Sequence, residues 1–217
     1  MKYPKIETLY DRDTEGNYGV IPGQLRQLEF SLIKRWLFTE KVDGRNHRIM
    51  LFPDGHIEHK GRTDKAQFTD FMTDALDRLI DEDKVREVIN VCEDGTWPQA
   101  TIYGELYGPK IQDGGKYRDD LSLCLFDVRV GDWWLEWDDV IMIADGLGLE
   151  TVPVLGYCSI LPTSKAEILN LFLDGYSHIE SAAMGTEPEG IVARTFPMLF
   201  DRHGKRVIWK LKLKDFQ

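Results

Sequence analysis

Long apolar runs are missing from this sequence of 217 residues. No stretch approaches the ~18 consecutive apolar residues that a membrane-spanning helix requires. The first residues, MKYPKIETLYDRDTEGN, have no apolar centre of the kind that a secretory signal peptide contains. We therefore expect a soluble, intracellular protein that works in the cytoplasm and has no membrane as a partner.

Cysteine is also scarce. The three cysteines, Cys92, Cys124 and Cys158, are odd in number and lie far apart in the chain. Disulfide frameworks use an even number of cysteines, and structural zinc sites use closely spaced pairs. We therefore expect reduced thiols, and neither a disulfide scaffold nor a zinc site.

Positive charge is in short supply. The chain has 27 Lys and Arg against 37 Asp and Glu, which gives a net charge of −10. Proteins that bind nucleic acid by neutralising phosphates are usually basic, or carry a basic patch. The overall balance argues mildly against a tight, independent nucleic-acid binder. It still allows a local patch, and basic residues do gather in the C-terminal stretch DRHGKRVIWKLKLKDFQ.

The familiar glycine-rich nucleotide loops are absent as well. There is no GxGxxG and no Walker sequence, so a Rossmann site and a P-loop are not indicated. The string DGGKY at residues 113–117 has glycines before a lysine, but its spacing does not fit a phosphate loop. An ordinary glycine-rich loop explains it at least as well.

Hydrophobic patterning predicts an α+β protein with mainly antiparallel sheets and flanking helices. Strands precede and alternate with helices, without the strict βαβ rhythm of a parallel sheet. We expect a single domain over residues 1–217. The predicted strands cover residues 35–41, 46–52, 99–108, 119–130, 151–161, 189–196 and 206–214, and the predicted helices cover 63–90, 136–149 and 163–175.

Particular residues mark where these helices should begin and end. Thr63 or Asp64 can cap the first helix at its N-terminus. Gly146 or Gly148 should stop the second helix. Ser164 and Glu167 form a capping box for the third helix, and Gly175 follows its end. The residues named for the three helices lie in the strings TDKAQF, ADGLGL and TSKAEILNLFLDG, respectively.

The stretch FTEKVDGRNHRI contains a lysine, Lys41, between Glu40 and Asp43. One explanation is a surface ladder of ion pairs beside a turn that Asp43 and Gly44 form. The other is a nucleophile, which a lysine becomes only when its amine is neutral. Neighbouring carboxylates favour the charged ammonium, so a nucleophilic Lys41 would need other cations close by.

Suitable cations and carboxylates occur elsewhere in the chain. Lys210 and Lys212 are two residues apart on a predicted strand and should share a face. Glu105 in YGELYG and Glu189 in EPEGIVAR each adjoin a glycine that lets a ligand approach the backbone. Such a set suits a nucleoside triphosphate, although each string alone also fits an ordinary strand or turn.

Five strings in one order change this assessment: EKVDGRN, YGELYG, LFDV, EPEGIVAR and IWKLK. Together they resemble the five collinear motifs of the covalent nucleotidyltransferases, namely ATP-dependent DNA and RNA ligases and mRNA capping enzymes. The K-x-D-G motif of that superfamily corresponds to Lys41, Val42, Asp43 and Gly44. The resemblance implies a nucleotidyltransferase (ATP-grasp-like ligase) domain that transfers adenylate. The chain ends soon after the last motif, so we expect no C-terminal OB-fold.

Among these families the chain is most similar to the RNA ligases. DNA ligases more often show K-x-D-G-x-R, whereas here Arg45 directly follows Gly44 and Asn46 comes next. Capping enzymes are less similar after the first motif. The resemblance therefore implies an ATP-dependent RNA ligase that joins a 5′-phosphate to a 3′-hydroxyl.

The resemblance also implies a role for each matching residue. Lys41 would attack the α-phosphate of ATP and carry AMP. The nucleotide would contact Glu40, Asn46, Arg62, Glu105, Phe126, Glu189, Lys210 and Lys212, and Glu105 and Glu189 would also bind Mg²⁺ or Mn²⁺. Phe126 would stack on adenine, although its position also fits plain core. Glu40 would contact the adenine amino group or hold Lys41 in place.

Three other interpretations stay open. They are a minimal ATP-dependent DNA ligase, a non-catalytic module that binds a nucleotide or RNA, and a structural α+β domain with lysines on an edge strand. For the ligase, the partners are nucleic-acid ends, with RNA favoured. We expect a basic groove near Lys205, Arg206, Lys210, Lys212 and Lys214. Either this groove binds the nucleic acid weakly and in a salt-sensitive way, or an accessory protein helps to bind it.

Overall fold

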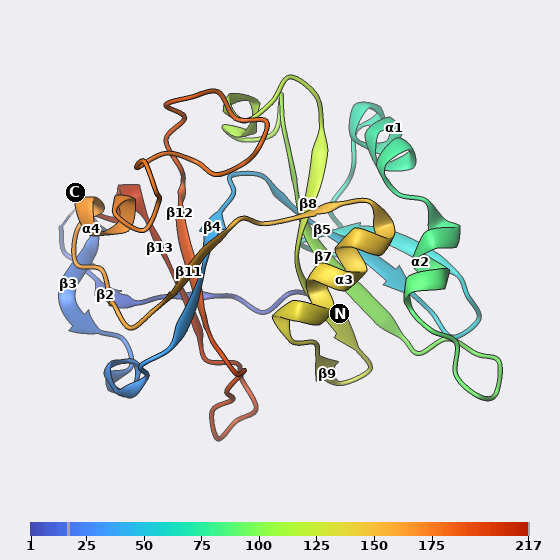
Figure 1. Cartoon of the computed structure of the whole chain (residues 1–217), viewed down its shortest axis with the longest axis horizontal. Helices are drawn as coiled ribbons and strands as arrows, with labels where there is room; N and C mark the ends of the chain where they lie inside the picture. The colour runs from blue at the N-terminus through green and yellow to red at the C-terminus, as the bar shows by residue number, and fades with distance from the viewer. Residues whose placement is uncertain (17, 217) are drawn as a thin grey trace. The chain divides into compact units, whose positions relative to one another are not determined.

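The computed structural model describes residues 1–16 and 18–216, and its backbone contacts divide into two compact units (Figure 1). Unit 1 comprises Met1–Pro4 and Asp43–Thr151. Unit 2 comprises Lys5–Val42 and the chain from Val152 onward. The boundary therefore falls between Val42 and Asp43, inside the K-x-D-G motif. That the two units act as one adenylyltransferase domain stays a prediction.

Unit 1 is built on a sheet with the strand order β10-β8-β7-β5-β6, and β9 pairs with β8. All described pairs in it are antiparallel except β10 with β8. The elements are β5 (Arg45–Leu51), β6 (Ile57–Gly61), α1 (Asp70–Leu79), α2 (Glu82–Val88), β7 (Ala100–Tyr107), a 3₁₀ turn (Gly114–Lys116), β8 (Ser122–Val130), β9 (Trp133–Trp134), α3 (Trp137–Leu147) and β10 (Glu150–Thr151).

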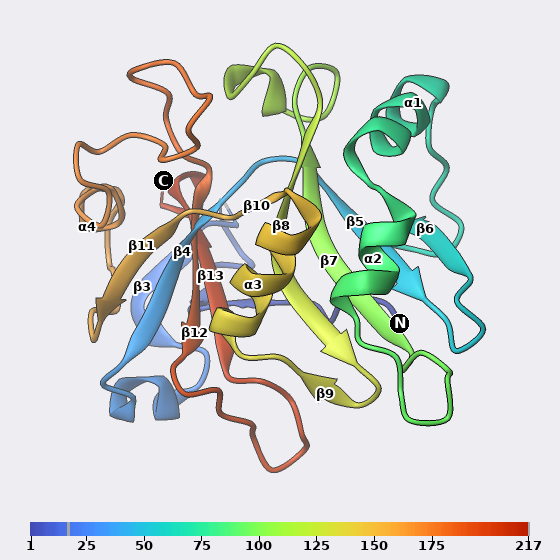
Figure 2. The same cartoon turned by 45° about the vertical axis from the view of Figure 1, so that its right-hand side comes forward.

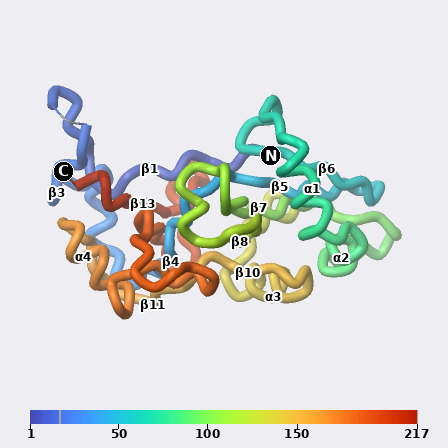
Figure 3. Tube along the Cα trace, turned by 90° about the horizontal axis from the view of Figure 1, so that it is seen from above, coloured from blue at the N-terminus to red at the C-terminus, as the bar shows by residue number. Residues whose placement is uncertain are grey.

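The two faces of this sheet differ in chemistry. Buried apolar residues alternate along the strands, as Ile49 and Leu51 do on β5, and the helices bury apolar residues such as Leu76 and Val140. Figure 3 shows α2 and α3 on one side of the sheet. Residues of the opposite parity, including Asn46 and its cross-strand partner Glu105, lie on the other face.

Unit 2 contains a five-stranded sheet in the order β1-β13-β12-β4-β11, and β2 pairs with β3 separately. Figure 2 shows β4, β12 and β13 side by side. The elements are β1 (Glu7–Thr8), β2 (Tyr10–Arg12), β3 (Val20–Leu25), a 3₁₀ helix (Leu28–Leu32), β4 (Trp36–Lys41), β11 (Val154–Cys158), α4 (Lys165–Leu169), β12 (Gly190–Thr195), β13 (Ile208–Lys212) and a 3₁₀ turn (Leu213–Asp215).

One face of the unit 2 sheet forms a hydrophobic core. Trp36 and Phe38 of β4 and Trp209 of β13 pack edge to face, with ring centroids 5.5 and 5.6 Å apart. Because side chains alternate along a strand, Lys41, Lys210 and Lys212 project from the other face. Burial agrees with this arrangement, since Trp209 and Leu211 are fully buried and the alternate residues Lys210 and Lys212 are half-buried.

The predicted α+β class with mainly antiparallel sheets is confirmed, and the strand ranges agree within a few residues. The prediction of one long first helix over residues 63–90 is wrong. Residues 63–69 are not helical, and Thr69, rather than Thr63 or Asp64, caps α1 through the amide of Met72. A second helix begins after Asp81, because extended backbone at Ile80 interrupts the first.

The other two helix ends agree in part. Gly148, in a left-handed conformation with φ 70°, ends α3 as predicted. Ser164 caps α4, but the carboxylate of Glu167 accepts from the amide of Thr163 rather than from Ser164. The helix also ends at Leu169, well before Gly175. No helix in the described residues is long and apolar enough to cross a membrane.

Unit 1 also contains a pair of histidines in contact, of which His47 is buried. His47 is fully buried, its Nε2 lies 3.0 Å from Nδ1 of His59, and the two rings stack with centroids 5.2 Å apart. Burial, followed by the nearby charges of His59, Arg48 and Arg45, lowers the pKa of His47 from 6.5 to about 3. His47 is therefore neutral in the folded protein at neutral pH.

This burial predicts acid sensitivity. Between about pH 6.5 and about pH 3 the unfolded chain protonates His47 and the folded chain does not, so stability falls as pH falls. The contribution is about 1.4 kcal/mol per pH unit. Urea denaturation of wild type and His47→Gln over this range should show a shallower pH dependence in the variant. His56→Gln, at an exposed position, is the control, and equal slopes for all three proteins would contradict the prediction.

Candidate active site

Three strands of unit 2 bring the motif residues to one level of the sheet. Gly190, the first residue of β12, lies opposite Lys41 of β4 on one side and opposite Lys212 of β13 on the other. A Cβ atom at Gly190 would lie 2.1 Å from the carbonyl oxygen of Leu211. Only glycine therefore fits between these two strands, which explains the glycine that follows Glu189.

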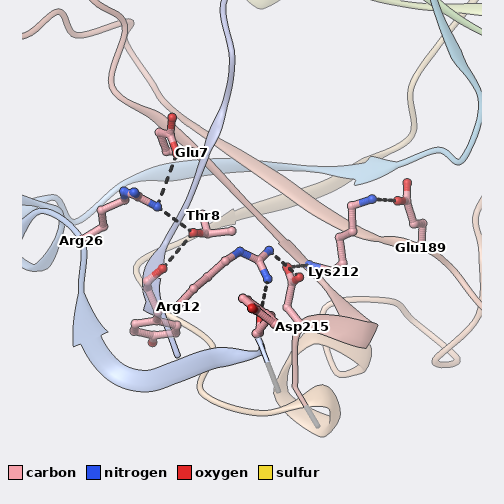
Figure 4. A network of polar contacts seen from close by, with 9 residues as sticks. Glu7, Thr8, Arg12, Arg26, Glu189, Lys212 and Asp215 are labelled. Carbon is pink, nitrogen blue, oxygen red and sulfur yellow. Dashed lines mark hydrogen bonds and ion pairs between the residues drawn. The ribbon is translucent and has the colours of Figure 1, made fainter. Parts of the chain in front are cut away.

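The carboxylate of Glu189 joins the two lysines directly. One oxygen accepts a hydrogen bond from Nζ of Lys41, and the other forms an ion pair with Nζ of Lys212 (Figure 4 shows the second contact). The Glu189 side chain is 8% exposed, so its charge is largely removed from water. The structure thus brings together Lys41, Glu189 and Lys212. The sequence predicted the neighbouring cations but not the carboxylate between them.

A second layer of contacts fixes the backbone at Lys212. The amide of Lys212 donates to Oδ2 of Asp215 over 2.9 Å, and Nη2 of Arg12 donates to Oδ1 over 2.7 Å (Figure 4). Asp215 is buried, and Arg12 compensates its charge. Sequence reasoning missed both residues, because no pattern links Arg12 on β2 to the C-terminal turn.

Glu40 faces the opposite way from Lys41. Its carboxylate is buried and accepts hydrogen bonds from the hydroxyl of Ser177 at 2.6 Å and from the amide of His178 at 2.8 Å. These bonds attach β4 to the segment that leads to Glu189. The sequence proposed adenine recognition or support of Lys41 for this residue, and the structure adds a role in holding residues 177–178.

In unit 1, Asn46 and Glu105 are directly opposed on β5 and β7. The Asn46 side-chain oxygen is buried and has no hydrogen-bond partner within the described residues. Gly44 lies against the same strand, since a Cβ there would meet the carbonyl oxygen of Leu106 at 2.5 Å and Cγ of Glu105 at 2.9 Å. The amide of Asp43 donates to the Tyr117 hydroxyl over 3.4 Å. Tyr117 is a contact that the sequence did not indicate.

Arg62 is exposed in the turn after β6. Arg48, a fully buried residue of β5, holds this turn by donating to the carbonyl of Gly61 at 2.8 Å and to the carboxylate of Asp64 at 2.8 Å. The hydrogen bond from Arg48 keeps the pKa of Asp64 below its ordinary value. This long-range anchor also explains why residues 63–69 do not join α1.

Phe126 is half-buried on the face of the sheet that carries Tyr103. Its ring lies edge to face against Tyr3 at 5.0 Å and stacks near Tyr103 at 6.5 Å. Tyr3 is anchored by a 2.6 Å hydrogen bond from its hydroxyl to Asp127. Phe126 therefore has a packing role in this structure, beside which adenine stacking stays a prediction.

The described residues contain no cluster of three or more His, Cys, Asp or Glu that could form a protein-only metal cage. Mg²⁺ rarely uses such cages, because it is usually bound by one or two carboxylates together with substrate phosphates. The carboxylates of Glu189 and Glu105 are hard oxygen donors and each fits that mode of binding.

Comparisons with known proteins bear on the fold and the family. A family model described as RNA ligase matches residues 34–212. A structure of Naegleria gruberi RNA ligase with PPi is 19% identical and covers 98% of this chain and 62% of that one, with a TM-score of 0.62. Mutants of that ligase solved with ATP and Mn, and with AMP and Mn, give TM-scores of 0.60 and 0.61 at 19% identity, covering 97% of this chain and 62% of theirs.

These matches confirm the expected fold. This chain spans about three fifths of the length of the Naegleria structures. No match was found among curated protein sequences.

The tight packing at Gly44 predicts that a methyl group there is not tolerated. Gly44→Ala would push its Cβ into Leu106 and Glu105, so the free energy of unfolding should fall by about 1–3 kcal/mol. Gly115→Ala is a matched control in the same unit, since its Cβ would meet nothing closer than 3.4 Å. Urea denaturation of both variants checks this; equal loss in the two, or none in Gly44→Ala, would contradict it.

Proposed function

The chain belongs to the RNA ligase family, and we propose that it is an ATP-dependent RNA ligase that works through a covalent lysyl-AMP. One observation carries the proposal: the side chains of Lys41 and Lys212 both contact the carboxylate of Glu189. Five motif residues from β4, the start of β12 and β13 belong to this part of unit 2, and they are Glu40, Lys41, Glu189, Lys210 and Lys212.

In the first step, the neutral amine of Lys41 attacks the α-phosphorus of ATP. A P–N bond forms, the P–O bond to the β-phosphate breaks, and pyrophosphate leaves. The ammonium must first lose a proton, and the Glu189 oxygen that already accepts its hydrogen bond is in position to take it. Lys212, which pairs with the other oxygen of Glu189, holds this carboxylate in place beside Lys41.

Phosphoryl transfer depends mainly on positioning and on neutralising charge. Lys210 and Lys212 lie on the same face of β13, and Lys212 lies at the level of Lys41 in the sheet. We assign both lysines to the phosphates. A bound Mg²⁺ or Mn²⁺ would neutralise further phosphate charge and help pyrophosphate to leave. Glu189 and Glu105 are the residues that we propose to hold it.

The motif residues of unit 1 are assigned to the nucleoside. The buried oxygen of Asn46 is an acceptor without a partner within the described residues, which suits a hydroxyl donor on the nucleotide. We assign Glu105, its cross-strand neighbour, to the ribose or the metal, and Phe126 to the adenine ring. Arg62 is exposed on its anchored turn and is assigned to the ribose or to the 5′-phosphate.

Two further steps complete the reaction. The 5′-phosphate of an RNA end attacks the phosphorus of lysyl-AMP, which breaks the P–N bond and returns Lys41. The 3′-hydroxyl of the other end then attacks the activated 5′-phosphate, forms the phosphodiester bond and releases AMP. The solved Naegleria RNA ligase structures with PPi, with ATP and Mn, and with AMP and Mn support this order of reaction steps by analogy of fold.

Incubation with α-labelled ATP and Mg²⁺ tests the first step. The wild type should carry a label that survives denaturing electrophoresis and is released by acid, because a phosphoramidate is acid-labile. Lys41→Ala should carry none, since the nucleophile is gone. Lys165→Ala, which removes an exposed lysine of the same unit, should label normally. If the wild type takes no label from ATP, GTP or NAD, a non-catalytic binding module is the better interpretation.

The choice between RNA and DNA needs its own measurement. Nicked duplexes whose 3′-hydroxyl strand ends in ribonucleotides should be sealed at least about tenfold faster than all-DNA nicks, because a site that contacts the 2′-hydroxyl discriminates against its absence. Single-turnover sealing by pre-labelled protein compares the two substrates directly. Equal sealing would support the DNA ligase alternative instead.

A further inference from the structure

Unit 2 carries an aromatic and cationic cluster at the other end of its sheet from Lys41. The guanidinium carbon of Arg35 lies 4.9 Å from the ring centroids of both Tyr157 and Phe196. The two rings meet edge to face at 5.2 Å, and the amide of Phe196 donates to the carbonyl of Arg35. We call Arg35, Tyr157 and Phe196 the Arg35 platform.

The platform lies on the same face of the sheet as Lys41. Tyr157 of β11 is opposite Leu37 of β4, and cross-strand partners project to one face. Alternation along β4 places Leu37, Thr39 and Lys41 on that face. Trp36 and Phe38, by contrast, point into the core.

The surface around the platform is exposed and basic. Tyr157 is 45% exposed, and the neighbouring hairpin after β12 exposes Leu199 and Phe200 at 46% and 50%. A backbone bridge between Phe200 and Arg206 shapes this hairpin. The segments 34–35 and 196–206 carry five basic residues and one acidic residue, Asp201, in a chain whose net charge is −10; the basic ones are Lys34, Arg35, Arg202, Lys205 and Arg206.

The single acidic residue is engaged within its own turn. The carboxylate of Asp201 accepts from the amides of His203 at 2.8 Å and Lys205 at 2.9 Å. The hydrogen bond from the backbone amide of Lys205 keeps the pKa of Asp201 below its ordinary value. The hairpin turn is thereby held in a shape that presents Arg202 and Lys205 to solvent.

We propose that the Arg35 platform and the 196–206 hairpin bind a single-stranded stretch of the RNA being joined. A base stacks on the exposed ring of Tyr157, and the basic side chains contact neighbouring phosphates. Aromatic rings accept any base, and nearby cations neutralise the backbone, which is the usual composition of single-strand binding surfaces. The proposal rests on the proposed function, because it assigns a path to the substrate of that reaction.

The spacing sets the length of RNA that is needed. Tyr157 lies opposite Leu37, which is four residues along β4 from Lys41, so Tyr157 lies about 13 Å along the sheet from Lys41. A stacked strand rises about 3.4 Å per nucleotide, so about four nucleotides bridge that distance. A shorter strand that occupies the reactive end does not reach Tyr157.

Binding of 5′-phosphorylated single strands, measured by fluorescence anisotropy, tests this path. Tyr157→Ala should bind a strand of about 12 nucleotides about tenfold more weakly and a strand of about two nucleotides as the wild type does. Tyr157→Phe keeps the ring and should bind both strands normally. Tyr176→Ala is the matched control, since Tyr176 is 44% exposed in the same unit and outside the platform.

A second measurement does not depend on Tyr157. The double variant Lys205→Gln, Arg206→Gln should reduce the slope of log affinity against log salt by about 1.4 for the long strand, at about 0.7 per lost phosphate contact. Melting temperatures of all variants identify any that fail to fold. If Tyr157→Ala does not fold, the salt slope decides, and an unchanged slope overturns the proposal.

The remaining outcomes are distinct from failure of the proposed function. Equal affinity of Tyr157→Ala and Tyr176→Ala for the long strand overturns the proposal and leaves the surface to a protein partner. Equal weakening on both strand lengths overturns it as well, because the path from Lys41 is then wrong. Absence of label on wild-type Lys41 refutes the ligase chemistry, while the RNA affinities still test the platform.

Discussion

The pairing of one carboxylate with two lysines is the interaction on which the rest of unit 2 depends. A carboxylate as buried as Glu189 is strongly destabilising without partners, and here Lys41 and Lys212 compensate it from two different strands. The cluster keeps an excess of one positive charge, which suits a polyphosphate. The same pairing orients Lys41, and in the proposed reaction Glu189 is also the group that accepts the proton which Lys41 must lose.

The K-x-D-G motif combines requirements from both units. Lys41 belongs to unit 2, where the register of β4 and β12 sets its level. Asp43 and Gly44 belong to unit 1, where the turn contacts Tyr117 and packs against β7 without room for a side chain. Each residue type is therefore required by its own surroundings. An inserted residue in this short link would displace either the lysine or the glycine from its contacts.

Local patterns predicted the strands well because alternation and buried runs are visible in the sequence. The opposite directions of Glu40 and Lys41 were predictable too, since adjacent strand residues face opposite sides. The predicted start of the first helix was wrong because Arg48, which is distant in sequence, holds Gly61 and Asp64 in a turn. The collinear motifs predicted a set of site residues, but they did not predict that Glu189 bridges two lysines, because nothing in a single sequence reports a contact between residues 41 and 189.

The acidic composition of the chain is compatible with the proposed polyanionic substrate because charges act locally. At physiological ionic strength, exposed charges more than about 8–10 Å apart are largely screened from each other. The first turns of α1 and α2 concentrate acidic residues in unit 1, where Asp70, Glu82 and Asp83 also favour the helix termini. Basic residues gather instead around the Arg35 platform and along β13 in unit 2. A phosphate beside Lys205 or Lys212 therefore responds to those near cations, and the net charge of −10 describes solubility better than it describes binding.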